Sequence, residues 1–193
     1  MIIYLTKKTI ERYDVAMPVD IMNPVMRSAI LNTCRNEKGN QLLEWGAKLF
    51  YFDHRKCLQL CNFASKLTIV LVDIKKADID NVGQYIVEYI RDIYSDDKRM
   101  TDLLKRWFKE HPIVCFDKIT DQRIIGTMNR FQRLYLEDGY RLYEFIDNGG
   151  VLRTFELNRK INKDYVMTKT IAGKKEYFFP VEKFAELLKE YYK

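Results

Sequence analysis

The residues from Trp45 to Asp73 follow a pattern of apolar and polar positions that is typical of three consecutive β-strands. Residues 45–52 are rich in aromatic and aliphatic side chains that suit a pleated, half-buried surface. The polar pair Asp53-His54 has the length of a hairpin turn, and residues 56–62 then alternate with a period of two. Residues 67–72 form a continuous apolar run, as expected of a strand covered on both faces. The stretch therefore predicts an antiparallel meander whose third strand lies inside the sheet.

Apolar positions at helical spacing predict amphipathic helices around this meander. Residues that suit a first helical turn begin them at Asn23-Pro24, Asp78 or Asp80, Asp97, Thr120 and Pro180. Further extended segments are expected at 2–5, 113–116, 152–157, 165–171 and 174–179, with a hairpin turn at Ala172-Gly173.

The fold class that follows is α+β, with a mainly antiparallel sheet and a central three-strand meander at about 45–73 covered by amphipathic helices. Residues 1–136 form the core domain of this prediction. Residues 137–193 form a C-terminal β-hairpin and helix, either as an extension of the same domain or as a small subdomain.

Composition narrows the class of protein further. The chain is 47% hydrophobic and 31% charged, which is ordinary for a folded protein. No apolar run approaches the roughly 18 residues that cross a membrane. The first residues place positive charge after the apolar stretch, which is the reverse of a signal peptide. We therefore expect a cytoplasmic protein without membrane contact, whose four cysteines stay reduced.

The net charge of +6 is concentrated in two segments, 98–133 and 151–175. A solvated surface explains such charge without any partner. Alternatively, the cations contact phosphates, and the protein binds or processes nucleic acid. The cations of the first segment are Lys105, Arg106 and Lys109 on one predicted helix and Arg123, Arg130 and Arg133 on the next. No known nucleic-acid motif accompanies them.

Catalytic and metal-binding motifs give little support for an enzyme. His54, Cys57 and Cys61 match no standard zinc spacing, and a strand would separate the two cysteines by about 13 Å. There is no phosphate-binding loop, dinucleotide fingerprint or nucleophile elbow. Carboxylates near predicted strand ends leave a metal-dependent nuclease open, namely Asp53, Asp73, Asp117 and Asp121. We expect no metal and no cofactor, and we favour a non-catalytic protein.

Several short segments resemble a bacterial domain family of unknown function. They are Thr6-Lys7-Lys8, Trp45-Gly46-Ala47, Arg55-Lys56, Asn62 and Met128-Asn129, and they place the resemblance roughly at residues 2–135. The resemblance implies a small cytosolic protein associated with mobile elements, and it implies no activity. The candidate binding residues that follow from it and from the basic helix are Trp45, Arg55, Lys56, Asn62, Arg123, Asn129, Arg130 and Arg133.

Three functional hypotheses remain open. The first is a non-catalytic module that binds another macromolecule, and the second is a protein that binds or cleaves nucleic acid through 98–133 and 151–175. The third is an enzyme acting on a small molecule, which requires Trp45, Arg55 and Asn129 to share one pocket. Trp45 also fits a core position, and Asn62 and Asn129 also fit turns that need their amide groups.

Overall fold

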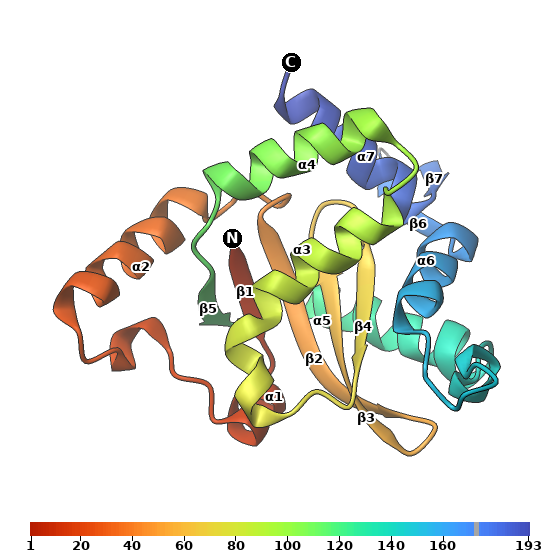
Figure 1. Cartoon of the computed structure of the whole chain (residues 1–193). Helices are drawn as coiled ribbons and strands as arrows, with labels where there is room; N and C mark the ends of the chain where they lie inside the picture. Colours follow the sequence, from red (N-terminus) through yellow and green to blue (C-terminus); the bar gives the residue numbers. More distant parts are fainter. Residues whose placement is uncertain (172–173) are drawn as a thin grey trace.

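The computed structural model describes residues 1–171 and 174–193, and its centre is a five-stranded sheet (Figure 1). The strands are β1 (Ile2–Leu5), β2 (Glu44–Phe52), β3 (Arg55–Asn62), β4 (Thr68–Val72) and β5 (Cys115–Lys118), in the spatial order β4-β3-β2-β1-β5. The meander pairs β2, β3 and β4 antiparallel, whereas β1 is parallel to both β2 and β5. Helices pack on this sheet, which confirms the predicted α+β class.

The meander begins with the predicted two-residue turn between β2 and β3. Asp53 and His54 have positive φ angles of 45° and 63°, which is the backbone of the hairpin turn that matches strand twist. A carboxylate oxygen of Asp53 also accepts a hydrogen bond of 2.6 Å from the backbone N–H of Leu142. The turn is therefore fastened to the short 3-10 helix Leu142–Phe145 that follows much later in the chain.

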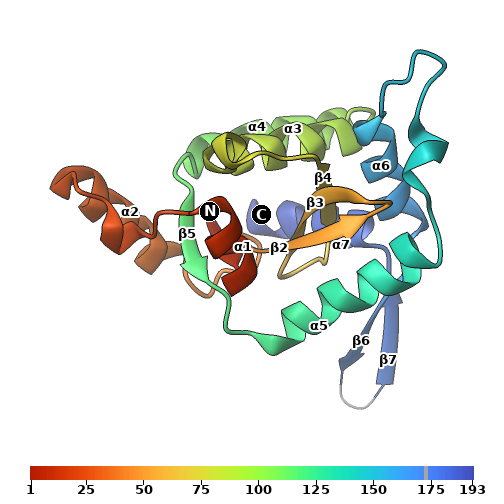
Figure 2. The same ribbon diagram turned by 90° about the horizontal axis from the view of Figure 1, so that it is seen from below.

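Helices cover the two faces of the sheet as separate layers (Figure 2). On one face lie α3 (Val82–Ile93), α4 (Lys98–Glu110) and α7 (Pro180–Tyr191), whose buried residues join those of the sheet in the largest apolar cluster. On the other face lies α5 (Gln122–Phe131), which continues as a π-helical turn over Gln132–Glu137. Successive residues of β2 face opposite sides of the sheet. Trp45 therefore faces the layer of α3, α4 and α7, and Gly46 faces α5.

α6 (Thr154–Asp164) closes the outer edge of β4 with side chains in place of a further strand. The Asn158 amide accepts from the backbone N–H of Val70 at 2.7 Å and donates to the Val70 carbonyl at 3.0 Å. Asn162 does the same at Thr68, at 2.9 Å and 2.6 Å. Four helical residues rise about 6 Å and two strand residues about 6.6 Å, so the two spacings match. Edge groups that would otherwise be buried without partners are thereby satisfied.

Two predictions about β4 and α6 are wrong. Residues 67–72 do not lie inside the sheet, because β4 is an edge strand whose edge α6 covers. Residues 152–157 are not extended, because α6 begins at Thr154. The buried stripe of α6 includes Asn158 and Asn162, so its hydrophobic periodicity is interrupted. In addition, Asp121 rather than Thr120 caps α5.

The amino-terminal part carries a helix that projects from the body (Figure 1). β1 ends at Leu5, and the next residue, Thr6, caps α1 (Lys7–Tyr13). A short 3-10 turn follows at Pro18–Asp20. α2 (Pro24–Glu37) begins as predicted, since the Asn23 side chain accepts from the N–H groups of Val25 and Met26. We call residues 18–37 the arm.

The carboxyl-terminal part forms a hairpin and a helix. β6 (Met167–Ile171) and β7 (Lys174–Phe178) are antiparallel, and the predicted turn at Ala172-Gly173 lies outside the described residues. Pro180 begins α7 as predicted, and Phe184 and Leu188 are buried in the largest apolar cluster. The division into residues 1–136 and 137–193 stays a prediction.

The remaining short segment is the 3-10 turn Lys76–Asn81, in which Asp78 accepts from the backbone N–H of Lys75. The prediction that Asp78 or Asp80 caps α3 is wrong, because both residues lie in this turn and the cap position of α3 is Asn81. Asp97 caps α4 as predicted. None of the helices in the described part of the chain has both the length and the apolar character needed to cross a bilayer.

Candidate functional site

Two of the candidate residues, Trp45 and Asn62, are buried inside the fold. Trp45 has no exposed surface and packs at 6.4 Å from the Phe184 ring. Asn62 is equally buried at the end of β3. Its oxygen accepts from the Ser65 N–H and hydroxyl at 3.0 and 2.9 Å, and its amide nitrogen donates to two backbone carbonyls. Both side chains therefore lie inside the fold, and a binding role for either residue stays a prediction.

Arg55 and Lys56 lie at the end of the sheet where β2 and β3 meet. Arg55 forms an ion pair with Asp73, which follows β4. The Lys56 ammonium lies 5.3 Å from the centre of the Tyr13 ring of α1. Burial raises the pKa of the Tyr13 hydroxyl to about 12. The pair thus holds the sheet end to its neighbours.

Asn129 belongs to a polar network under α5. Its oxygen accepts from the Lys48 ammonium, which also donates to Gln132 at 2.8 Å. Gln132 in turn donates to the buried Gln59 at 2.8 Å. Burial lowers the pKa of Lys48, and the positive charge of Lys8 lowers it further. The network fixes α5 to β2 and β3.

The three candidate arginines lie on the exposed side of α5 and its continuation. Arg123 pairs with Asp121 through two contacts of 3.1 Å, and its side chain is 90% exposed. Hydrogen bonds from Arg123 hold the pKa of Asp121 below its usual value. Arg130 and Arg133 are exposed and form no ion pair with any described residue. We call these three arginines the α5 arginines.

The two predicted basic segments do not form single surfaces. α4 and α5 lie on opposite faces of the sheet (Figure 2), so segment 98–133 is divided between them. On α4, Lys105 and Arg106 pair with acidic residues of the same helix. In segment 151–175, Arg153 pairs with Glu156 and Arg159 pairs with Asp92. On α5 and its continuation, Arg123 pairs with Asp121, whereas Arg130 and Arg133 have no such partner among the described residues.

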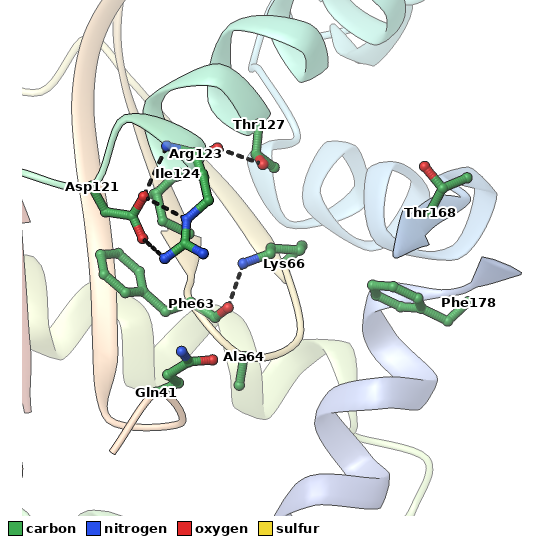
Figure 3. A pocket seen from close by; sticks show the side chains of 10 residues that line it. All are labelled: Gln41, Phe63, Ala64, Lys66, Asp121, Arg123, Ile124, Thr127, Thr168 and Phe178. Atoms are coloured by element: carbon green, nitrogen blue, oxygen red, sulfur yellow. Dashed lines mark hydrogen bonds and ion pairs between the residues drawn. The ribbon is translucent and has the colours of Figure 1, made fainter. Parts of the chain in front are cut away.

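A cavity of about 460 Å³ opens beside the first turns of α5 (Figure 3). Most of its lining comes from the turn after β3 with Phe63 and Lys66, α5 with Arg123 and Thr127, and the β6–β7 hairpin with Phe178, and Gln41 adds a residue from before β2. Lys66 donates to the backbone carbonyl of Phe63. We call this space the α5 cavity; it combines aromatic walls, two cations and a carboxylate.

The arm carries several exposed apolar side chains that sequence reasoning missed. Met22 is 95% exposed and Val25 78%, and other exposed apolar residues of the arm are Val19, Met26 and Leu31. A cleft of about 430 Å³ lies between α2 and the body, next to Met26 and Val114. The spacing of Met26 and Ile30 indicated a helix. Spacing does not show whether other parts of the chain cover the apolar side of that helix.

The residues required by the enzyme hypothesis are dispersed. Trp45 faces the layer of α3, α4 and α7, Asn129 lies on α5, and Arg55 is at the hairpin end of the sheet. The four carboxylates do not meet either: Asp73 pairs with Arg55 and Asp121 with Arg123. Among the described residues, no three histidine, cysteine or acidic side chains gather closely enough to hold a metal ion. All four cysteines are free thiols.

These features define an α+β protein with an exposed apolar arm and a basic helix beside an aromatic cavity. The chain belongs to the family described as a domain of unknown function, DUF6933, whose model matches residues 2–183. The match extends beyond the range 2–135 in which the sequence resemblance was seen, and it includes the hairpin and the start of α7. No curated protein and no solved structure matches the chain.

Proposed function

We propose that this protein is a non-catalytic module that binds a protein partner through the arm. The single observation that supports this function is the exposure of apolar side chains on the arm, led by Met22 and Val25. Large apolar side chains gathered on one exposed element mark interaction sites in folded proteins. Methionine side chains also adapt easily to the shape of a partner.

The charge of the arm specifies the chemistry of that partner. Arg27, Leu31 and Arg35 are exposed and follow one another at intervals of four residues, so they share a stripe of α2. Neither arginine forms an ion pair within the described parts of the chain. Asp20, in contrast, caps its own turn by accepting from the backbone N–H of Met17. The arm therefore suits a protein surface that combines apolar side chains with carboxylates.

The cleft behind the arm gives that partner a place to anchor a side chain. It lies between Met26 and Ile30 of α2 and Val114 of the body, and its volume is about 430 Å³. Binding energy at interfaces concentrates where a few side chains enter such pockets. We expect the partner to insert an apolar residue there while its carboxylates meet Arg27 and Arg35.

The test compares proteins that co-purify with a tagged chain from its native host. The arm variant is Met22→Ser with Val25→Ser, and the matched control is Tyr143→Ser with Val151→Ser, which removes two exposed apolar residues outside the arm. A partner should be retained by the wild type and the control and lost from the arm variant. If the arm variant retains the same partner as the wild type, the proposal is contradicted. If analytical sedimentation shows dimers of the wild type that the arm variant does not form, the partner is a second copy of this chain instead of another protein.

A second candidate function is binding of nucleic acid through the α5 arginines. The observation that favours it is the exposure of Arg130 and Arg133 without ion pairs among the described residues. Phosphate contacts are salt-dependent because each one releases counterions. Retention on heparin or DNA that falls steeply with salt supports this function, whereas retention that is absent or indifferent to salt contradicts it.

The resemblance noted in the sequence adds a setting to these functions. We propose a bacterial, cytoplasmic protein from a mobile-element or defence context. The four free thiols suit a reducing compartment, and the setting itself rests on the resemblance alone. Fractionation of the native host, with the protein detected by antibody, tests the location.

A further inference from the structure

The α5 cavity has the size of a site for one small organic group. Its volume of about 460 Å³ falls within the range of about 300–1,000 Å³ that is usual for small-ligand pockets. The cavity is partly open to solvent, and Arg123 and Thr127 of α5 line it (Figure 3). A ligand held there would also reach the side of α5 that carries Arg130.

Two aromatic residues line this cavity from separate elements (Figure 3). Phe63 comes from the turn after β3 and is stacked on Tyr4 at 5.2 Å, which fixes its orientation. Phe178 comes from β7 of the hairpin and is half-buried. Flat aromatic walls favour a flat aromatic ligand, because stacking needs two planar faces and little sequence-specific geometry.

Cations lie at the rim of the same cavity. The pair with Asp121 uses two of the five N–H groups of Arg123, which leaves the rest of the guanidinium able to bind an anion. The Lys66 ammonium supplies a second positive charge beside Phe63. Thr127 adds a hydroxyl to the α5 wall. Planar aromatic walls beside cations match a nucleobase joined to phosphate.

The exposed surface of α5 continues the charge beyond the cavity. Arg130 lies seven residues after Arg123, which is about 10 Å along a helix. Arg133 follows on the π-helical turn. A strand of nucleic acid with one base in the cavity would therefore meet further cations along its backbone. A base paired inside a duplex is not available to enter a pocket, so this arrangement selects single strands.

We infer, on the basis of the nucleic-acid function proposed above, that the α5 cavity takes one unpaired base of a single-stranded nucleic acid. Phe178 stacks on the base, Arg123 and Lys66 contact the adjoining phosphates, and Arg130 and Arg133 hold the strand that leaves the cavity. The β6–β7 hairpin, which stands beside α5 (Figure 2), supplies the second wall of the site.

The experiment measures fluorescence anisotropy of a labelled 20-nucleotide oligothymidine and of its duplex with oligoadenine, using the full chain at several salt concentrations. Phe178→Ala should weaken binding of the single strand about tenfold, since stacking of one base has that order of effect. Phe178→Trp, which keeps an aromatic wall, should restore it. Tyr177→Ala is the matched control, because Tyr177 is exposed on the same strand and does not line the cavity.

A second pair of variants separates the cavity from the charged surface. Arg130→Ala with Arg133→Ala should lower affinity and reduce the salt slope by about 1.4 for a single strand. Lys98→Ala with Arg99→Ala removes two exposed cations from α4 and should leave both unchanged. The cavity site would be overturned if the chain bound single strand and duplex with equal affinity and if Phe178→Ala and Tyr177→Ala bound equally well. Binding through the arginines of α5 would then still stand. Absence of all nucleic-acid binding, or binding of the mononucleotide TMP with no binding of the oligonucleotide, would overturn both.

Discussion

Replacing Asn158 with alanine tests whether side chains seal the edge of β4. The change removes both hydrogen bonds to Val70 and leaves a buried N–H and a buried carbonyl without partners. Each such group costs about 1–3 kcal/mol, so the pair costs about 2–6 kcal/mol. Alanine returns about 0.6 kcal/mol, because it is the better helix former. We expect a net loss of about 3 kcal/mol in the free energy of unfolding.

Urea unfolding followed by circular dichroism measures this loss as a lower midpoint with an unchanged slope. The control is Asn32→Ala, the same exchange on the exposed surface of α2, where a gain of a few tenths of a kcal/mol is expected. Asn158→Asp keeps the size and the acceptor for the Val70 N–H but sets an oxygen against the Val70 carbonyl, so it should lose at least as much. If Asn158→Ala stays within about 0.5 kcal/mol of the control, the seal contributes nothing and the reasoning is wrong.

Three further results are expected. Gly83→Ala should lower the free energy of unfolding by about 1–2 kcal/mol, because a Cβ there would lie 2.3 Å from Val114 Cγ2. Gly126→Ala, with nothing within 4 Å of the new Cβ, should instead raise it by up to about 1 kcal/mol. Equal shifts of the melting temperature in the two variants would contradict both expectations. Replacing Arg123, Arg130 and Arg133 together with alanine should change the free energy of unfolding by less than about 0.5 kcal/mol. If a urea titration instead shows that the variant has lost its fold, the three arginines are structural. Burial raises the pKa of the Cys57 thiol to about 12, so this thiol stays protonated at pH 8. Iodoacetamide should therefore label Cys57 in the native protein only as fast as the chain opens. Labelling at the rate of an exposed thiol would contradict the burial of Cys57.

The sequence predicted the meander because its signals are local. A two-residue polar turn, a period of two and an apolar run lie within 30 residues of one another, and each reports on the burial of strand faces. The same signals do not report on strand edges. An apolar run such as 67–72 shows that both faces of β4 are covered, but the neighbour along its edge is α6, nearly 90 residues later. The position of β4 therefore could not be predicted.

The candidate site was less accessible for a related reason. Trp45 and Asn62 stand out in the sequence because the fold needs them, one in the core and one in a turn. Arg130 and Arg133 were found because charge at helical spacing predicts an exposed side. The α5 cavity was missed because Phe63 and Phe178 are 115 positions apart, and the arm was missed because its exposed methionines resemble core residues in any hydropathy pattern.

The place of β1 between β2 and β5 imposes an order on folding. The meander can assemble from one continuous piece of chain, whereas β1 gains its second neighbour only after Cys115 has been made. Closing that long loop is entropically slow compared with forming a hairpin. β1 precedes the meander in the chain, yet it should be among the last strands to become fixed in the sheet, and pulse-labelled hydrogen exchange would show later protection at β1 than at β3.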